Sequence, residues 1–160
     1  MTVTYLVGDA TRPQGEGPKV IVHCCNDAGG WGSGFVLALN ARWSKPRECY
    51  REWFREGAYA GTKFELGAIQ IIEVEADLCV VNLIGQHGYG KCSDPNDPFV
   101  RYDAVRAGLS KLISVIGTAS IHMPRIGCGL AGGTWWEMGP IIEEVFKDHQ
   151  VFVYDFEPPM

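Results

Sequence analysis

The sequence lacks any apolar stretch long enough to cross a membrane. Its longest apolar runs, such as Leu78–Ile84, fall far short of the roughly 20 residues that a membrane-spanning helix needs. The first ten residues, MTVTYLVGDA, contain no basic segment and reach the charged Asp9 too early for a secretion signal. We therefore expect a cytoplasmic protein with no membrane partner.

The sequence also has few basic residues. Its 14 Lys and Arg face 19 Asp and Glu, which gives a formal net charge of −5. A protein that binds duplex nucleic acid by releasing counterions needs a basic surface, so we expect no nucleic acid duplex as partner. Such a chain can still bind a phosphate, but it must do so with local backbone N–H groups.

The six cysteines lack the spacing of a metal site. None belongs to a CxxC pair, and no Cys and His set has the spacing of a zinc finger, so we expect no metal and no other cofactor. The 160 residues, 46% of them hydrophobic, suffice for a core without disulfides. We expect one domain over residues 1–160 that acts as a monomer.

The hydrophobic pattern predicts strands and helices in alternation. Helical periodicity predicts helices over 35–39, 47–60, 100–116 and 135–146. Short β-branched or apolar runs predict strands over 2–7, 20–24, 68–74, 78–84, 120–123 and 150–156. This order indicates a three-layer α/β/α fold with a mixed, mostly parallel central sheet. The tight connection between the strands 68–74 and 78–84 argues against an all-parallel sheet.

Two glycine-rich loops are the strongest functional signal. Residues 26–34 follow the strand 20–24, residues 125–133 follow the strand 120–123, and a helix follows each loop. This places both loops at the carboxyl ends of strands, where open α/β sheets bind ligands. Their backbone N–H groups suit a pyrophosphate, although a glycine-rich loop can also be a simple tight turn. Neither loop matches the P-loop or a Rossmann fingerprint.

These motifs, in this order, resemble those of the macrodomain family. The resemblance rests on VGDAT at 7–11, VIVHC at 20–24 with Asn26 and GGWGSG at 29–34, PRIGCGL at 124–130 and VYDF at 153–156. It covers nearly the whole chain. It is closest to the branch that contains terminal ADP-ribose protein glycohydrolase and to the ADP-ribose-1″-phosphate phosphatases. The fold of the family, a mixed sheet between helices, agrees with the predicted element order.

The resemblance implies a site for ADP-ribose. Asp9 would accept the adenine amino group beside the Ala10 amide, Phe156 would lie against adenine, and Asn26 would face the distal ribose. The remaining contacts would come from the two loops: Gly30, Trp31, Gly32, Ser33, Gly34, Phe35, Gly127, Cys128, Gly129, Leu130 and Ala131. From the residues alone, Asp9 could instead cap a turn, and Phe156 could be an aromatic at the core edge.

The catalytic groups of the family have no counterpart in this chain. Gln86 stands where the glycohydrolase branch has a lysine, Ala131 where it has an aspartate, and Val36 where another branch has an aspartate. A covalent lysine mechanism is therefore disfavoured. The chemically competent side chains that remain near the loops are His23, Asn26, Asp27, Gln86, His87 and Cys128.

Three of these candidates have a structural alternative. His23 lies within an apolar strand and could be a hydrogen-bonded core histidine, and His87 could be an exposed loop residue. Cys128 lies near a possible helix start, which could lower its pKa, or it could serve packing only. Of the candidates, we take Asn26, Gln86 and His87 as the catalytic residues.

The sequence thus predicts a protein that binds ADP-ribose or mono-ADP-ribosylated proteins and hydrolyses mono-ADP-ribosyl esters of acidic protein side chains. Water would attack with help from a ligand hydroxyl or phosphate, while Asn26 and His87 orient the reacting groups. Three alternatives stay open: an ADP-ribose-1″-phosphate phosphatase, a reader that binds ADP-ribose without turnover, and a module for another nucleotide.

Overall fold

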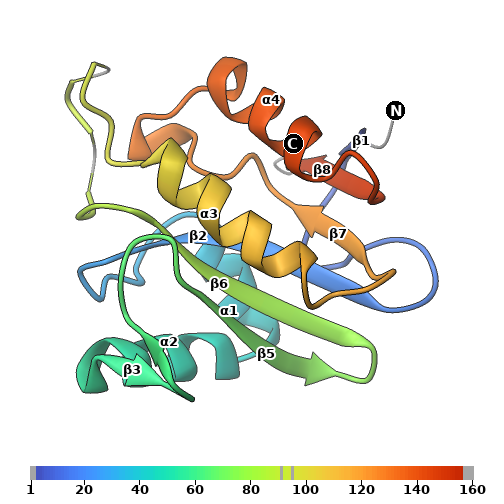
Figure 1. The fold of residues 1–160 in the computed structure, drawn as a ribbon, viewed down its shortest axis with the longest axis horizontal. Helices are drawn as coiled ribbons and strands as arrows, with labels where there is room; N and C mark the ends of the chain where they lie inside the picture. Colours follow the sequence, from blue (N-terminus) through green and yellow to red (C-terminus); the bar gives the residue numbers. More distant parts are fainter. Residues whose placement is uncertain (1–2, 91, 95, 157–160) are drawn as a thin grey trace.

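A computed structural model describes residues 3–90, 92–94 and 96–156. It contains a six-stranded sheet in the order β1-β8-β7-β2-β6-β5 (Figure 1). The strands are β1 (Val3–Val7), β2 (Lys19–Asn26), β5 (Ile69–Glu75), β6 (Leu78–Gln86), β7 (Ser120–Met123) and β8 (Val151–Asp155). All neighbouring strands are parallel except β5, which runs antiparallel to β6. The predicted mixed, mostly parallel sheet is confirmed.

Helices cover both faces of the sheet, because successive side chains of β2 are apolar and point to opposite faces. Ile21 packs with Leu39 of α1 (Phe35–Arg42) and Tyr50 of α2 (Lys45–Glu56). The next residue, Val22, packs on the other face with side chains of α3 (Tyr102–Ile113) and α4 (Trp135–Val145). Consecutive strand residues point to opposite faces, so a strand covered on both sides must be apolar throughout. The run 20–24 meets that need, and the three-layer arrangement follows (Figure 1).

Several predicted boundaries differ from the structure. The helix predicted over 47–60 begins at Lys45 and ends at Glu56, because Gly57 adopts a left-handed conformation with φ 80°. The next residues form an unpredicted hairpin of β3 (Ala58–Tyr59) and β4 (Thr62–Lys63), whose two turn residues also have positive φ. The helix predicted over 100–116 spans only α3. Of the strand predicted over 2–7, Thr2 lies outside the described residues.

In the part of the chain that the structure describes, no helix has the length and apolar character needed to cross a membrane. No group of three or more His, Cys, Asp or Glu side chains within that part is arranged to hold a metal ion.

Candidate functional site

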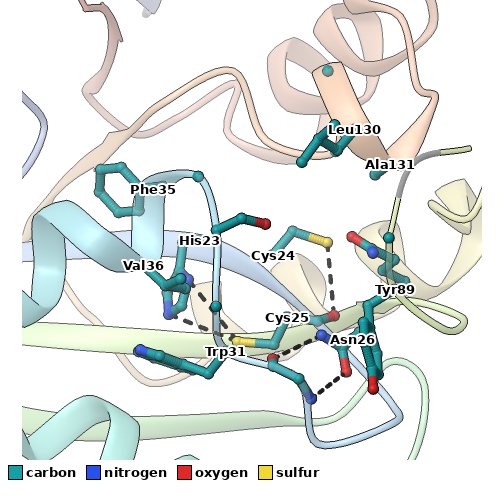
Figure 2. A pocket seen from close by; sticks show the side chains of 18 of the residues that line it. His23, Cys24, Cys25, Asn26, Trp31, Phe35, Val36, Tyr89, Leu130 and Ala131 are labelled. Atoms are coloured by element: carbon teal, nitrogen blue, oxygen red, sulfur yellow. Dashed lines mark hydrogen bonds between the residues drawn. The ribbon is translucent and has the colours of Figure 1, made fainter.

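A cavity of about 730 Å³ lies where the strands β2, β6 and β7 end at their carboxyl side. The two glycine-rich loops form its opposite sides, with Leu130 and Ala131 of the second loop facing Asn26 and Cys24 (Figure 2). The structure brings together in its lining most of the residues predicted to bind ADP-ribose: Asn26, Gly30, Trp31, Gly32, Ser33, Gly34, Phe35, Gly127, Cys128, Gly129, Leu130 and Ala131. Gln86 also lines it.

The first glycine loop is held in shape by the side chain of Asn26, the last residue of β2. Its Oδ1 accepts hydrogen bonds from the N–H groups of Ala28 (2.9 Å) and Gly30 (3.0 Å), and its Nδ2 donates to the Gly30 carbonyl (2.8 Å). The hydroxyl of Tyr50 donates to the Asn26 carbonyl at 2.6 Å and accepts from the Gly29 N–H at 3.1 Å. Asn26 is buried and has only one amide hydrogen left for a ligand.

Two glycines of this loop permit close contacts with aromatic rings. A Cβ on Gly29, which has φ 81°, would lie 2.7 Å from the Phe54 ring, and a Cβ on Gly30 would lie 2.9 Å from the Tyr89 ring. Both distances are too short for a side chain. The rings of Phe54 and Tyr89 therefore pack directly against the backbone of the loop, and Tyr89 also lines the cavity.

Backbone N–H groups on both loops are free to bind a ligand. Those of Trp31, Gly32 and Ser33 have no hydrogen-bond partner among the described residues, and the same holds for Gly127. Helix α1 begins directly after the first loop, which adds the N–H groups of its first two residues, Phe35 and Val36; the third, Leu37, already donates to the Gly34 carbonyl. Such an arrangement suits an anion with several oxygens.

The charge of the cavity is opposite to that of the chain. Among the described residues that line it, none is Asp or Glu, and the two charged side chains are Arg51 and Arg125. Arg125 donates two hydrogen bonds to Asp155, from Nε at 2.6 Å and from Nη2 at 3.0 Å. Its guanidinium lies 5.3 Å from the ring centroids of Tyr5 and Trp135. Arg51 forms no ion pair with any residue that the structure describes.

His23 lies on the cavity floor but is fastened to the core. It is buried, and its Nε2 lies 2.5 Å from Oδ1 of Asn82, an acceptor, so that nitrogen carries the proton. Burial lowers the pKa of His23 to about 4, so the ring is neutral near pH 7. His23 is therefore a hydrogen-bonded core histidine that also borders the cavity.

The cavity cysteines are protonated thiols. Burial raises the pKa of Cys24 to about 12 and raises that of Cys128 above its usual value, although Arg125 acts in the opposite direction on Cys128. The hypothesis that the position of Cys128 lowers its pKa is therefore wrong. The loss of solvation outweighs the nearby positive charge.

His87 lies outside the cavity lining. Its Nδ1 lies 2.7 Å from Oδ2 of Asp27, and Oδ1 of Asp27 accepts from the Gly88 N–H at 2.9 Å. Burial acts to raise the pKa of Asp27, but the hydrogen bonds from Gly88 and His87 outweigh it and hold that pKa below its usual value. His87 and Asp27 thus tie the segment after β6 to the first loop.

Asp9, Ala10 and Phe156 also lie outside the lining, at the neighbouring ends of β1 and β8. The Gly8 N–H donates to the Asp155 carbonyl at 2.9 Å, which places the residues after the two strands side by side. Oδ1 of Asp9 accepts from the N–H and the hydroxyl of Thr11, as expected of a turn-capping residue, while its Oδ2 has no partner among the described residues. Ala10 is buried and Phe156 is exposed.

Sequence reasoning missed several residues of the lining, among them three with large polar or charged side chains: Arg51, Tyr89 and Arg125. Two of these three carried a weak signal, because Arg125 lies within PRIGCGL and Tyr89 lies between two glycines. Arg51 is one of several arginines on an amphipathic helix, and nothing in the local pattern distinguishes it from the others.

Comparisons with solved structures decide the family. A protein of unknown function from Bacteroides thetaiotaomicron is 52% identical, with a TM-score of 0.88 and coverage of 97% of this chain and 98% of that one. A macrodomain protein from Streptomyces coelicolor is 43% identical, with a TM-score of 0.80 and coverage of 96% and 98%. The chain belongs to the macrodomain family. No family-level sequence profile matches it.

Curated relatives of this macrodomain include proteins with two different names. The mouse protein named Chromodomain-helicase-DNA-binding protein 1-like is 31% identical over 172 residues, which are 99% of this chain but 18% of the relative. This macrodomain thus spans less than a fifth of the length of that relative, and the same holds for the zebrafish protein of that name. The ADP-ribose 1″-phosphate phosphatase of Lodderomyces elongisporus is 25% identical over 170 residues, which are 97% of this chain and all of that protein.

Proposed function

We propose that this macrodomain binds ADP-ribose in the cavity and hydrolyses the bond between its distal ribose and the carboxylate of an acidic protein side chain. The observation that carries the proposal is the cavity itself. In a chain of net charge −5, two glycine-rich loops with unpaired N–H groups enclose a space whose described lining has arginines and no carboxylate. A dianionic pyrophosphate fits this environment, and a cation does not.

The strand order supports one orientation of the ligand. Asp9 and Phe156 lie at the ends of β1 and β8, the two loops follow β7 and β2, and Gln86 ends β6. Four strand spacings separate β1 from β6, which is about 19 Å. An extended ADP-ribose would place adenine near Asp9, the pyrophosphate between the loops, and the distal ribose near Asn26 and Gln86.

The described lining supports a mechanism without a nucleophilic side chain. It contains no lysine and no carboxylate, its histidine is neutral, and its cysteines are protonated. In the proposed step, a water oxygen bonds to the anomeric carbon, C1″, and the bond from C1″ to the ester oxygen breaks. The carboxylate leaves with the electron pair, and the proton of water passes through a ligand phosphate to solvent. The protein contributes chiefly by positioning these groups.

Three residues have proposed roles in this positioning. Gln86 lines the distal end, and its Nε2 already donates to the Gly88 carbonyl at 3.0 Å, which leaves its oxygen free to orient water or a ribose hydroxyl. Asn26 shapes the loop beside the distal ribose. His87 acts through Asp27, which joins the segment after β6 to that loop.

Two measurements test the proposal. Titration calorimetry with ADP-ribose should show one site per chain, and the absence of binding would overturn the assignment of the cavity. Incubation with glutamate-, aspartate-, serine- and arginine-linked ADP-ribosyl substrates should release free ADP-ribose from the first two only. Release from the arginine-linked substrate alone would show that the protein cleaves another kind of linkage, and the proposal of ester hydrolysis would be wrong.

The second candidate is a phosphatase acting on ADP-ribose 1″-phosphate. It is favoured by the curated relatives of that name, which this chain matches over nearly their whole length. A reader without turnover is the third candidate, and the absence of ionisable catalytic groups from the described lining favours it. Phosphate release from ADP-ribose 1″-phosphate, measured with the same samples, distinguishes the phosphatase from the other two.

A further inference from the structure

Arg51 is held beside the first glycine loop by its neighbours on α2. The preceding residue, Tyr50, is bonded through its hydroxyl to Asn26 and Gly29. Phe54, three residues later and therefore on the same face of the helix, has its ring against Gly29. Arg51 lies between these two contacts and lines the cavity.

The two arginines of the lining differ in whether a neighbouring carboxylate neutralises their charge. Arg125 is neutralised by two hydrogen bonds to Asp155 and is covered by the rings of Tyr5 and Trp135. Arg51 has no ion-pair partner among the described residues, and the next arginine on α2, Arg55, is paired with Glu56. Arg51 thus provides the only unneutralised guanidinium in the described lining.

The two arginines also lie at different ends of the cavity. Arg125 is bonded to Asp155 at the end of β8, beside the residues proposed for adenine. Arg51 lies between Tyr50 and Phe54, which contact the first loop at Asn26 and Gly29. Asn26 pairs with Gln86 at the end of β6, so Arg51 lies at the β6 side of the cavity. A ligand whose adenine lies near β1 and β8 therefore directs its distal ribose toward Arg51.

We infer that Arg51 binds an oxyanion attached to C1″ of the distal ribose and thereby selects substrates from which such a group leaves. This inference rests on the proposed function and deepens it. The planar guanidinium can donate two parallel hydrogen bonds to a carboxylate or to a phosphate, so both leaving groups share the required chemistry. In ester hydrolysis, the carboxylate that forms when the bond from C1″ breaks gains negative charge, which Arg51 stabilises.

The experiment compares the wild-type protein with Arg51→Gln and with Arg55→Gln as a matched control. Arg55 lies one helical turn away, loses the same charge when substituted, and does not line the cavity. Each protein is titrated with ADP-ribose and with ADP-ribose 1″-phosphate while phosphate release is followed. Each is also assayed with a peptide that carries one glutamate-linked ADP-ribose. Thermal melting verifies that all three proteins are folded.

A lost hydrogen bond to a charged group should weaken binding about 10-fold at a partly exposed site. Arg51→Gln should therefore lose about 10-fold in affinity for ADP-ribose 1″-phosphate, in kcat/KM for the peptide ester, or in both. Its affinity for ADP-ribose should stay within about 3-fold of wild type, because ADP-ribose itself carries no oxyanion on C1″. Arg55→Gln should match wild type in every assay.

The pattern of losses identifies the oxyanion. A loss confined to the peptide ester assigns a protein carboxylate, and a loss confined to ADP-ribose 1″-phosphate assigns a phosphate. The role proposed for Arg51 is wrong if Arg51→Gln retains wild-type affinity and turnover for both compounds, or if Arg55→Gln loses as much affinity or turnover as Arg51→Gln. The proposed ADP-ribose site is unaffected by either result. If the wild-type protein does not bind ADP-ribose at all, the proposed function fails and the inference fails with it.

Discussion

The two glycine-rich loops enclose the same cavity but are stabilised by different parts of the chain. Side chains hold the first loop, through Asn26 and Tyr50. Backbone groups hold the second: the Gly133 N–H donates to the Gly127 carbonyl at 2.9 Å, and the Gly132 N–H donates to the Gly129 carbonyl at 3.0 Å. The comparison shows that N–H groups free to bind a ligand can be held in place by side chains in one loop and by backbone hydrogen bonds in the other. It also predicts that the loops respond differently to substitution.

A carboxylate placed in either loop should have the largest effect on binding. We expect Gly32→Glu and Gly129→Glu each to reduce ADP-ribose affinity more than about 100-fold, because the new charge repels the pyrophosphate. A Cβ meets nothing within 4 Å at either position, but Gly129 has φ 82°. Gly129→Glu should therefore lose about 1 kcal/mol of stability through backbone strain, and Gly32→Glu should lose almost none. Calorimetry and urea unfolding measure the two effects. If both variants lose the same stability, the predicted difference in backbone strain between Gly32 and Gly129 is wrong.

Removing the support of the first loop should have a large effect on stability. Asn26→Ala leaves the N–H groups of Ala28 and Gly30 without their acceptor, which should cost about 2–3 kcal/mol. For a domain of this size, the melting temperature should fall by roughly 4–12 °C. In the second loop, Cys128 makes no side-chain hydrogen bond to a described residue, so Cys128→Ala should cost less than about 1 kcal/mol. If Cys128→Ala destabilises as much as Asn26→Ala, the second loop also depends on its side chains.

A buried neutral histidine lies on the strand that leads into each loop, and both make folding sensitive to acid. His23 bonds to Asn82, and His122 on β7 bonds to Ser120 and Tyr154. Burial lowers the pKa of each to about 4, below the value near 6.5 of an unfolded chain. Between these values the unfolded chain binds more protons, so stability is full above pH 6.5 and falls as the pH drops toward 4.

The loss should amount to about 2–3 kcal/mol for each histidine. Urea unfolding at several pH values between 7 and 4 measures it. His23→Asn and His122→Asn should each remove about half of the pH dependence within this window. A wild-type unfolding free energy that does not change between pH 6.5 and 4.5 would contradict the prediction.

The smallest effect is expected for His87. Because it bonds to Asp27 outside the cavity lining, His87→Ala should change ADP-ribose affinity and kcat by no more than about 3-fold. Steady-state kinetics with the peptide ester, together with calorimetry, measures both values. A fall in kcat of about 100-fold with unchanged affinity would instead indicate that His87 transfers a proton in the reaction.

The sequence alone determined the layers of the fold and the place of the site. A continuous apolar run such as 20–24 can be stable only when both faces of a strand are covered, and glycine-rich segments between strand and helix can lie only at the strand ends. The sequence did not reveal the hairpin after Gly57, whose strands of two residues are too short to carry a pattern. It named Asn26 and His87 as catalytic residues, which stays a prediction, but it did not reveal the hydrogen bonds by which each also supports a loop.

Only the tertiary structure decided which charged side chains at the cavity become paired and which reach it unpaired. Arg125 and Asp155 are separated by 30 residues in the chain, and they meet because β7 and β8 are neighbours. Arg51 reaches the cavity because α2 packs against the first loop through Tyr50 and Phe54. Hydrophobic periodicity is a local property of the chain and is visible in the sequence. The pairing of charges depends on which distant elements become neighbours, and packing alone sets that.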